Sequence, residues 1–204
     1  MVLNCYNCAK KYFPEDVTKE HIPSKCLFEG TTVNEKENRI TVNACKVCNQ
    51  EYAKTSDEEF RNYLAIIANE NTKIEFIQKA DRAFIRNFEK VINKISYLHD
   101  GIYISIDFNF IRKQHYKDFK GVFYHLNGIP FPENDYILSV VTEKDEMVKN
   151  FYELNCNMIN FLKNFDWRIS GSEEIFRYKL WKINPKDLPF RWPYKNSFLC
   201  LMDY

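Results

Sequence analysis

Residues 17–30 read VTKEHIPSKCLFEG and lie between two cysteine pairs, CYNC at residues 5–8 and CKVC at residues 45–48. Two intervening residues let both thiolates of a pair reach one ion from a tight turn, and two such pairs supply the four sulfurs of a tetrahedral zinc site. Such a closed site leaves no coordination position open, so it would hold the fold and would not catalyse a reaction. We therefore predict a structural Zn²⁺ ion bound by Cys5, Cys8, Cys45 and Cys48.

The composition is that of a folded chain, and its net charge alone assigns no partner. The chain has 204 residues, a formal net charge of +1, and only 5 glycines and 7 prolines. These values are typical of one moderate domain or two small ones, and they exclude long low-complexity segments. Because the net charge is close to zero, a nucleic-acid site would have to come from local clusters of basic residues.

Localisation is predicted from the apolar runs and from the cysteines. No apolar run reaches the length that spans a membrane, and the N-terminus lacks the pattern of a secretory signal. We therefore expect a cytoplasmic protein with no membrane partner. Cysteines stay reduced in that compartment, so those outside the two pairs are expected to be free thiols: Cys26, Cys156 and Cys200.

The pattern of the chain changes near residue 56. Residues 1–55 are polar and rich in turns, so they need a metal ion or a neighbouring element to hold them. Ser56 and Glu59 have the spacing of a capping box, with Ser56 as the N-cap, and predict a helix that follows it over residues 57–69. Apolar periodicity and turn residues predict further helices over residues 72–96, 110–127 and 143–165, and strands over residues 102–108, 136–141, 174–183 and 196–204.

Three segments around the cysteine pairs carry a family resemblance. They are EHIPSKCLF at residues 20–28, NRITVNACKVCNQ at residues 38–50 and TSDEEFRNYL at residues 55–64. This layout resembles the bacterial HNH endonucleases, which are ββα-metal nucleases with a flanking zinc knuckle. The resemblance implies an α+β chain in which residues 1–64 form the zinc-held HNH module. Residues 65–204 would then form a helical connection and an α+β domain that selects substrate or binds a partner.

The resemblance also implies a mechanism for hydrolysing phosphodiester bonds in DNA. His21 would be the general base, since imidazole titrates near neutral pH. Glu20 and Asn49 would give oxygen ligands to one divalent ion, Mg²⁺ or Mn²⁺, which stabilises the leaving oxygen. Asn38 would fasten the loop that orients His21, and Asn34 and Asn43 are the alternatives for that role.

A basic stripe on the helix predicted over residues 72–96 is a candidate nucleic-acid contact. It consists of Lys79, Arg82, Arg86 and Lys90, which lie opposite the apolar residues of that helix. The alternative is an ordinary solvated helix face.

Two other functions remain open at this point. One is a zinc ribbon that binds nucleic acid or protein without catalysis, and the other is an HNH-type ribonuclease or toxin. Analogy alone suggests that the chain acts in a restriction or antiphage system, together with a partner protein.

Overall fold

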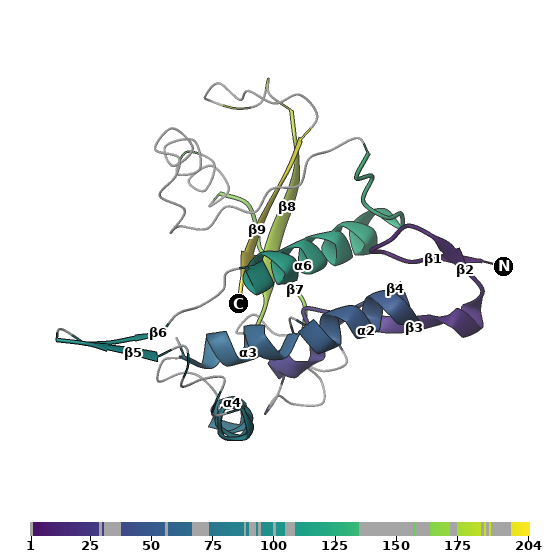
Figure 1. Cartoon of the computed structure of the whole chain (residues 1–204). Coiled ribbons are helices and arrows are strands. Elements are labelled where there is room, and N and C mark those ends of the chain that lie inside the picture. The colour runs from purple at the N-terminus through teal and green to yellow at the C-terminus, as the bar shows by residue number, and fades with distance from the viewer. Residues whose placement is uncertain are drawn as a thin grey trace.

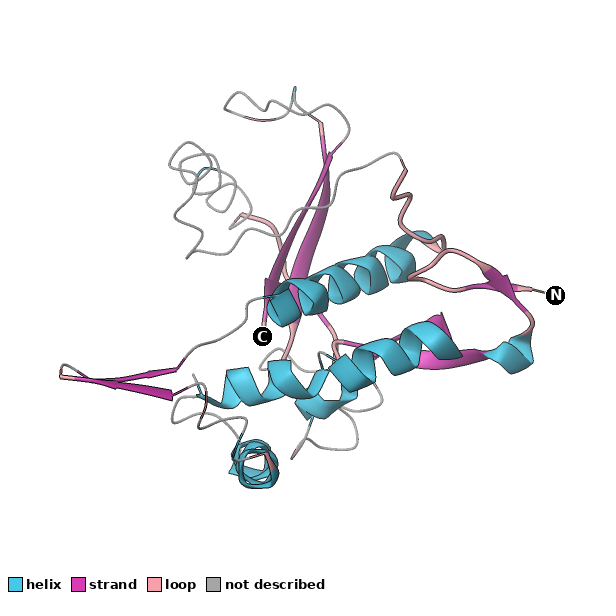
Figure 2. Cartoon of the chain, viewed as in Figure 1, coloured by secondary structure: helices cyan, strands magenta, loops and turns pink. Residues whose placement is uncertain are grey.

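Short antiparallel strands and longer helices follow one another along the chain, so the predicted α+β class is confirmed by the computed structural model (Figure 1). Figure 2 shows the same arrangement by element type. The structure describes residues 2–28, 30, 38–55, 57–66, 74–87, 89, 93, 95–99, 101–104, 109–134, 157, 164–171, 175–184, 186, 188 and 197–204.

The strands that the structure describes all pair in antiparallel fashion. They form the two-stranded sheets β1-β2, β3-β4 and β5-β6 and the three-stranded sheet β7-β8-β9. In chain order the elements are β1 (Leu3–Asn4), β2 (Lys11–Tyr12), η1 (Pro14–Asp16), β3 (Val17–Ile22), η2 (Lys25–Phe28), β4 (Ile40–Cys45), α2 (Lys46–Thr55), α3 (Asp57–Ile66), α4 (Ile74–Arg86), β5 (Ile95–Leu98), β6 (Gly101–Ile104), α6 (Asn109–Asn127), β7 (Arg168–Ile169), β8 (Arg177–Ile183) and β9 (Ser197–Asp203).

The β3–β4 hairpin is the scaffold of the candidate site. Glu20 lies opposite Val42 and Ile22 lies opposite Ile40 in its antiparallel register. Alternate residues of a strand point to the same face, and Glu20 and Ile22 are both buried. α2 begins at the residue that follows the last residue of β4, so the hairpin and this helix are joined without a loop.

α6 packs against the β3–β4 hairpin, and its side chains share a core with both the hairpin and β8 (Figure 1). Gly121 of α6 permits this approach, because a Cβ built on it would lie 2.4 Å from Cδ1 of Ile22. This core therefore contains residues from both sides of residue 64, where the sequence predicts a domain boundary. The boundary stays a prediction. The buried members of this core are Tyr6, Ile22, Ile40, Val42, Ala44, Val122, Phe176 and Tyr178.

A second core joins η2, α3, α4 and the first turn of α6. The helix predicted to follow Ser56 is confirmed as α3, whose Phe60 is buried in this core, and Ser56 itself lies outside the described residues. The helix predicted over residues 110–127 is confirmed as α6, which ends before Gly128 with its positive φ of 70°. Within the described part of the chain, no helix combines the length and the apolar character that crossing a membrane requires.

The helix predicted over residues 72–96 is too long. α4 ends at Arg86, and Ile95 lies in β5, where it pairs with Ile104 of β6. The side chain and backbone amide of Asn87 both donate hydrogen bonds to the carbonyl of Ala83, which satisfies an acceptor of the last turn of α4.

The strands predicted near the C-terminus are confirmed as β8 and β9, with slightly shorter bounds. The strand predicted over residues 102–108 is described only as β6. The strand over residues 136–141 and nearly all of the helix over residues 143–165 lie outside the described residues.

Candidate functional site

The four paired cysteines lie together at the end of the β3–β4 hairpin. Their sulfur atoms are all within 4.8 Å of one another. A tetrahedral zinc ion with four sulfurs at about 2.3 Å places the sulfurs about 3.8 Å apart, so a small contraction would close the cluster on an ion. The four cysteines can therefore hold a metal ion such as zinc, as the spacing of the two pairs predicts.

Local backbone geometry forms this cluster. Cys5 and Cys8 lie in the turn between β1 and β2, where Ala9 has a positive φ of 60° and its amide donates to the carbonyl of Cys5 at 3.0 Å. Cys45 ends β4, and its sulfur accepts a hydrogen bond of 3.5 Å from the amide of Cys48. Burial alone would raise the pKa of Cys45, but this amide and the Tyr12 hydroxyl lower it to about 7. That thiol is therefore close to the thiolate form that binds metal.

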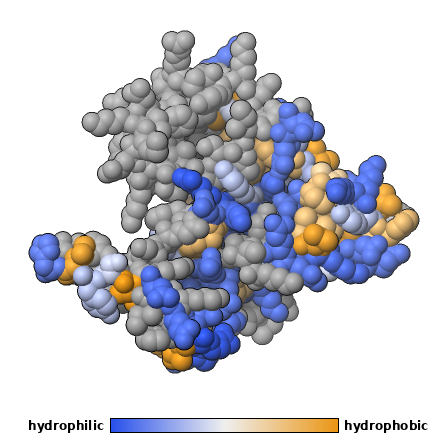
Figure 3. Space-filling model, viewed as in Figure 1, coloured by the Kyte–Doolittle hydropathy of each residue, from blue (hydrophilic) through white to orange (hydrophobic). Residues whose placement is uncertain are grey.

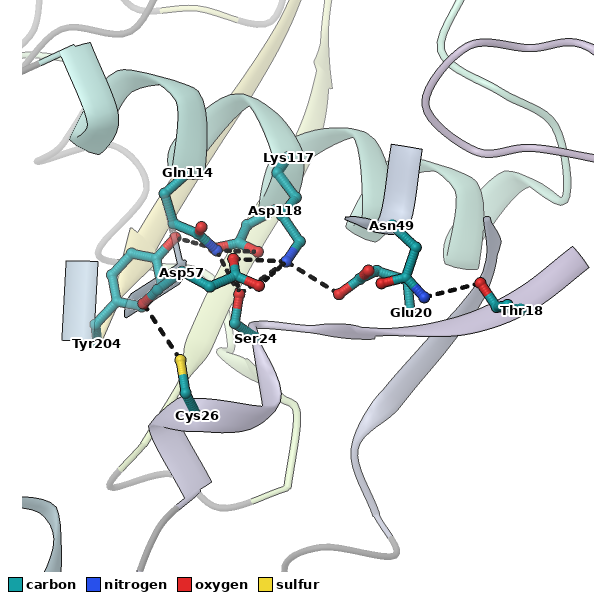
Figure 4. Close-up of polar contacts among 10 residues, drawn as sticks. All are labelled: Thr18, Glu20, Ser24, Cys26, Asn49, Asp57, Gln114, Lys117, Asp118 and Tyr204. Carbon is teal, nitrogen blue, oxygen red and sulfur yellow. Dashed lines mark hydrogen bonds and ion pairs between the residues drawn. The ribbon is translucent and has the colours of Figure 1, made fainter. Parts of the chain in front are cut away.

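Glu20 and Asn49 meet on one face of the hairpin. The side-chain amide of Asn49, from α2, donates a 2.8 Å hydrogen bond to the hydroxyl of Thr18. Thr18 and Glu20 are two residues apart on β3 and so point to the same face. Figure 4 shows the Asn49 side chain reaching the strand beside Glu20. The two predicted metal ligands are thus brought together.

The carboxylate of Glu20 is buried, and its two oxygens differ in their contacts with the described residues. Oε1 forms an ion pair with Lys117 at 3.0 Å. Oε2 is buried and has no hydrogen-bond partner within the part of the chain that the structure describes. Burial raises the pKa of Glu20, and Lys117 opposes that shift. An oxygen without a partner beside a side-chain amide fits the donor set that a hard divalent cation prefers.

His21 follows Glu20 on the strand and is half-buried. Its Nδ1 is buried and lacks a hydrogen-bond partner among the residues described here. Burial lowers the pKa of His21, and the positive charges of Arg39, Lys25 and Lys117 lower it further. The imidazole is therefore mainly neutral at neutral pH, which is the form that accepts a proton. Neighbouring residues of a strand point to opposite faces. A group that contacts both Glu20 and His21 must therefore lie at the edge of the hairpin, from which both faces can be reached.

Asn38 and residues of the basic stripe have contacts of their own. The backbone carbonyl of Asn38 accepts a 3.1 Å hydrogen bond from the amide of Gly171, and its side chain is exposed. On α4, Arg82 is exposed and Arg86 is paired with Glu58 at 3.7 Å. Lys79 is half-buried on the same helix, and Lys90 lies outside the described residues. Figure 3 shows apolar side chains on the surface over α4 and the β5–β6 hairpin as well, so this surface is mixed.

A buried network centred on Lys117 completes the site, and sequence reasoning missed it. The Lys117 ammonium contacts Glu20, both carboxylate oxygens of Asp57 at 2.9 and 3.1 Å, and the Ser24 hydroxyl at 2.8 Å (Figure 4). Gln114 donates to Ser24 at 3.0 Å and also to Asp118. The hydroxyl of Tyr204 donates to Asp118 at 2.6 Å.

A signal for this network is present in the sequence. Gln114, Lys117, Asp118 and Gly121 have the i, i+3, i+4, i+7 spacing of one helix face. That face would ordinarily be apolar on a helix that packs against a core, so polar residues there indicate buried partners.

Comparison of the chain with protein-family models, with curated proteins and with solved structures found no match. The arrangement of the site therefore has to be interpreted from its own chemistry.

Proposed function

We propose that this chain is a metal-dependent endonuclease of the HNH type that hydrolyses phosphodiester bonds in DNA. The observation that supports the proposal most is the placement of Glu20 and Asn49 beside each other on one hairpin face (Figure 4), with the Oε2 atom of Glu20 buried and without a hydrogen-bond partner among the described residues. His21 lies next in the chain, and a cluster of four cysteines holds the end of the same hairpin. Binding alone requires no such combination.

Each residue has a defined part in the proposed reaction. His21 accepts the proton of the attacking water, and the burial and neighbouring cations that keep its imidazole neutral favour that role. Arg39 and Lys25 place positive charge near His21, where a phosphate group would lie. Glu20 and Asn49 would hold the divalent ion through side-chain oxygens. When bound, Mg²⁺ or Mn²⁺ supplies a positive charge that stabilises the leaving oxygen.

The cysteine cluster has a structural part only in this proposal. A zinc ion with four sulfur ligands has no open position for water or substrate. It would fix the β1–β2 turn to the start of α2, and so fix Asn49, which is the residue after Cys48. The cysteines therefore place one proposed ligand of the catalytic ion without touching that ion.

The test is cleavage of plasmid DNA by the purified chain, with and without Mg²⁺ or Mn²⁺. Glu20→Gln and His21→Ala are expected to abolish cleavage, and His125→Ala is the matched control because His125 is exposed in the last turn of α6. High metal concentration is expected to rescue part of the activity of Asn49→Ala and none of that of His21→Ala.

The other candidate functions give different results in the same assay. Single-stranded DNA and RNA substrates separate a DNA nuclease from a ribonuclease or toxin of the same chemistry. A chain that binds DNA but never cuts it, under any of these metal conditions, is a zinc-held binding module. Full activity in a folded His21→Ala chain would contradict the mechanism.

A further inference from the structure

The ammonium group of Lys117 lies fully inside the protein, which is rare for lysine. Its side chain is 0% exposed, and it comes from α6, far along the chain from the hairpin that carries Glu20. Its partners include one oxygen of Glu20, both carboxylate oxygens of Asp57 and the hydroxyl of Ser24. Three elements that are distant in sequence, β3, α3 and α6, therefore meet at a single positive charge (Figure 4).

Stability alone does not account for this arrangement. The cost of removing two charges from water often exceeds their attraction, so apolar side chains of similar volume stabilise many cores equally well. Every member of the network is nevertheless oriented by another member. Ser24 donates to Asp57 at 2.5 Å, and Gln114 donates to Ser24 at 3.0 Å. Such a closed set of contacts fixes side-chain positions, which an apolar core would not do for a carboxylate.

The contacts of Glu20 show which atom is fixed and which is left for a ligand. Oε1 is 3.0 Å from Lys117. Oε2 is buried with no hydrogen-bond partner among the residues that the structure describes. Lys117 thus occupies one oxygen of the carboxylate and turns the other toward the face where Asn49 bonds to Thr18.

We propose that Lys117 is a positioning residue that holds Glu20 by Oε1, so that Oε2 is the oxygen presented to the divalent ion. This inference rests on the proposed function, because it assigns Glu20 as a ligand of that ion. It assigns Asp57 and Ser24 to the task of holding the ammonium in place. Lys117 itself touches neither substrate nor metal.

The experiment measures Mn²⁺ binding by the full-length chain directly, by calorimetry and by the electron paramagnetic resonance signal of free Mn²⁺. Lys117→Met keeps most of the length of the side chain and removes its charge. Its dissociation constant for Mn²⁺ is expected to rise by about 10- to 100-fold, the usual effect of losing a residue that orients a ligand. Lys113→Met is the control, since Lys113 is exposed one turn earlier on the same helix. It is expected to bind Mn²⁺ like the wild type.

A second variant covers the case in which Lys117→Met does not fold. Asp57→Asn leaves both Lys117 and Glu20 in place but removes the charge that holds the ammonium from the other side. It is expected to weaken Mn²⁺ binding by several-fold. In cleavage assays, both variants are expected to need more metal for half-maximal activity, with the KM for DNA unchanged. Loss of a residue with only a structural role would not raise the metal requirement while leaving the KM for DNA unchanged.

Each outcome supports or overturns the inference. Unchanged Mn²⁺ affinity in either folded variant overturns it, and so does tighter binding, because that result makes Lys117 a competing cation. A wild-type chain whose Mn²⁺ binding is unaffected by Glu20→Gln overturns it as well. If Mn²⁺ binding depends on Glu20 and Lys117 but no nucleic acid is cut, the positioning role stands and the proposed nuclease function fails.

Discussion

Replacing Gly121 by Ala in α6 is expected to disturb the strand that carries the candidate site. The added Cβ would lie 2.4 Å from both Cδ1 and Cγ1 of Ile22 and 3.3 Å from its Cγ2. Carbon atoms in contact normally lie about 3.5–4.0 Å apart, so Ile22 or α6 must move by roughly 1 Å. Ile22 is 0% exposed and therefore has no solvent-filled space to move into.

Two opposing effects set the change in the free energy of unfolding. Alanine favours a helix interior over glycine by about 1 kcal/mol, and overpacking a filled core costs about 1–3 kcal/mol. We therefore expect the free energy of unfolding to fall by about 0–2 kcal/mol for Gly121→Ala. Cleavage is expected to fall more steeply, up to about 100-fold, because a 1 Å shift of His21 and Glu20 misplaces the reacting groups.

A double-mutant cycle with Ile22→Ala isolates the contact between the two residues. Ile22→Ala alone leaves a cavity and is expected to cost about 2–5 kcal/mol. The double variant removes the clash and partly fills that cavity, so the two changes are expected to couple favourably by about 1–3 kcal/mol. Urea unfolding of the four proteins measures this coupling. Additive effects, or a Gly121→Ala chain more stable than the wild type, would refute the packing argument.

Three further predictions concern metal, pH and charge. Cys45→Ser is expected to lose the bound zinc, present at about one ion per chain in the wild type, and to unfold the β1–β2 turn; elemental analysis of protein purified without chelators checks both proteins. Burial raises the pKa of Asp118 to about 7, although Lys117, Tyr204 and other neighbours partly oppose this shift. The folded state therefore keeps a proton that the unfolded state loses near pH 4, and stability falls as pH rises from about 4 to 7. Asp118→Asn is expected to remove that decline, at most about 4 kcal/mol, in urea titrations across this range; an unchanged decline would place its source elsewhere. Reversing Arg82 and Arg86 to Glu is expected to weaken DNA binding and to flatten its dependence on salt, and equal affinity and slope would leave α4 as a solvated face.

Local signals in the sequence predicted the parts of the fold that depend on neighbouring residues. The paired cysteines predict a metal cluster because a CxxC turn is a local structure, and the four sulfurs do lie together. α6 ends where Gly128 permits a positive φ, which a glycine after an apolar periodic run indicates. The predicted helix over residues 72–96 failed because β5 depends on pairing with β6, a contact that helical periodicity does not detect.

The part of the site that the sequence did not predict depends on distant residues. The partners of Lys117, Glu20 and Asp57, lie in other elements that are distant in the sequence. A buried lysine is stable only beside such partners, so the spacing of polar residues on α6 indicates that partners exist but does not identify them. The roles of Glu20, His21 and Asn49 come only from the resemblance of the segments around the cysteine pairs, and they stay a prediction.

The dependence of the N-terminal hairpin on α6 also has a consequence for synthesis of the chain. Glu20 emerges from the ribosome long before Lys117, which follows roughly 100 residues later and so about 5–20 s later at common translation rates. Until then the carboxylate has no ammonium partner, and Ile22, Val42 and Ala44 lack the helix that covers them. The hairpin is therefore expected to complete its folding only after α6 has left the exit tunnel, so a partly synthesised chain would not yet hold Glu20 in its final position.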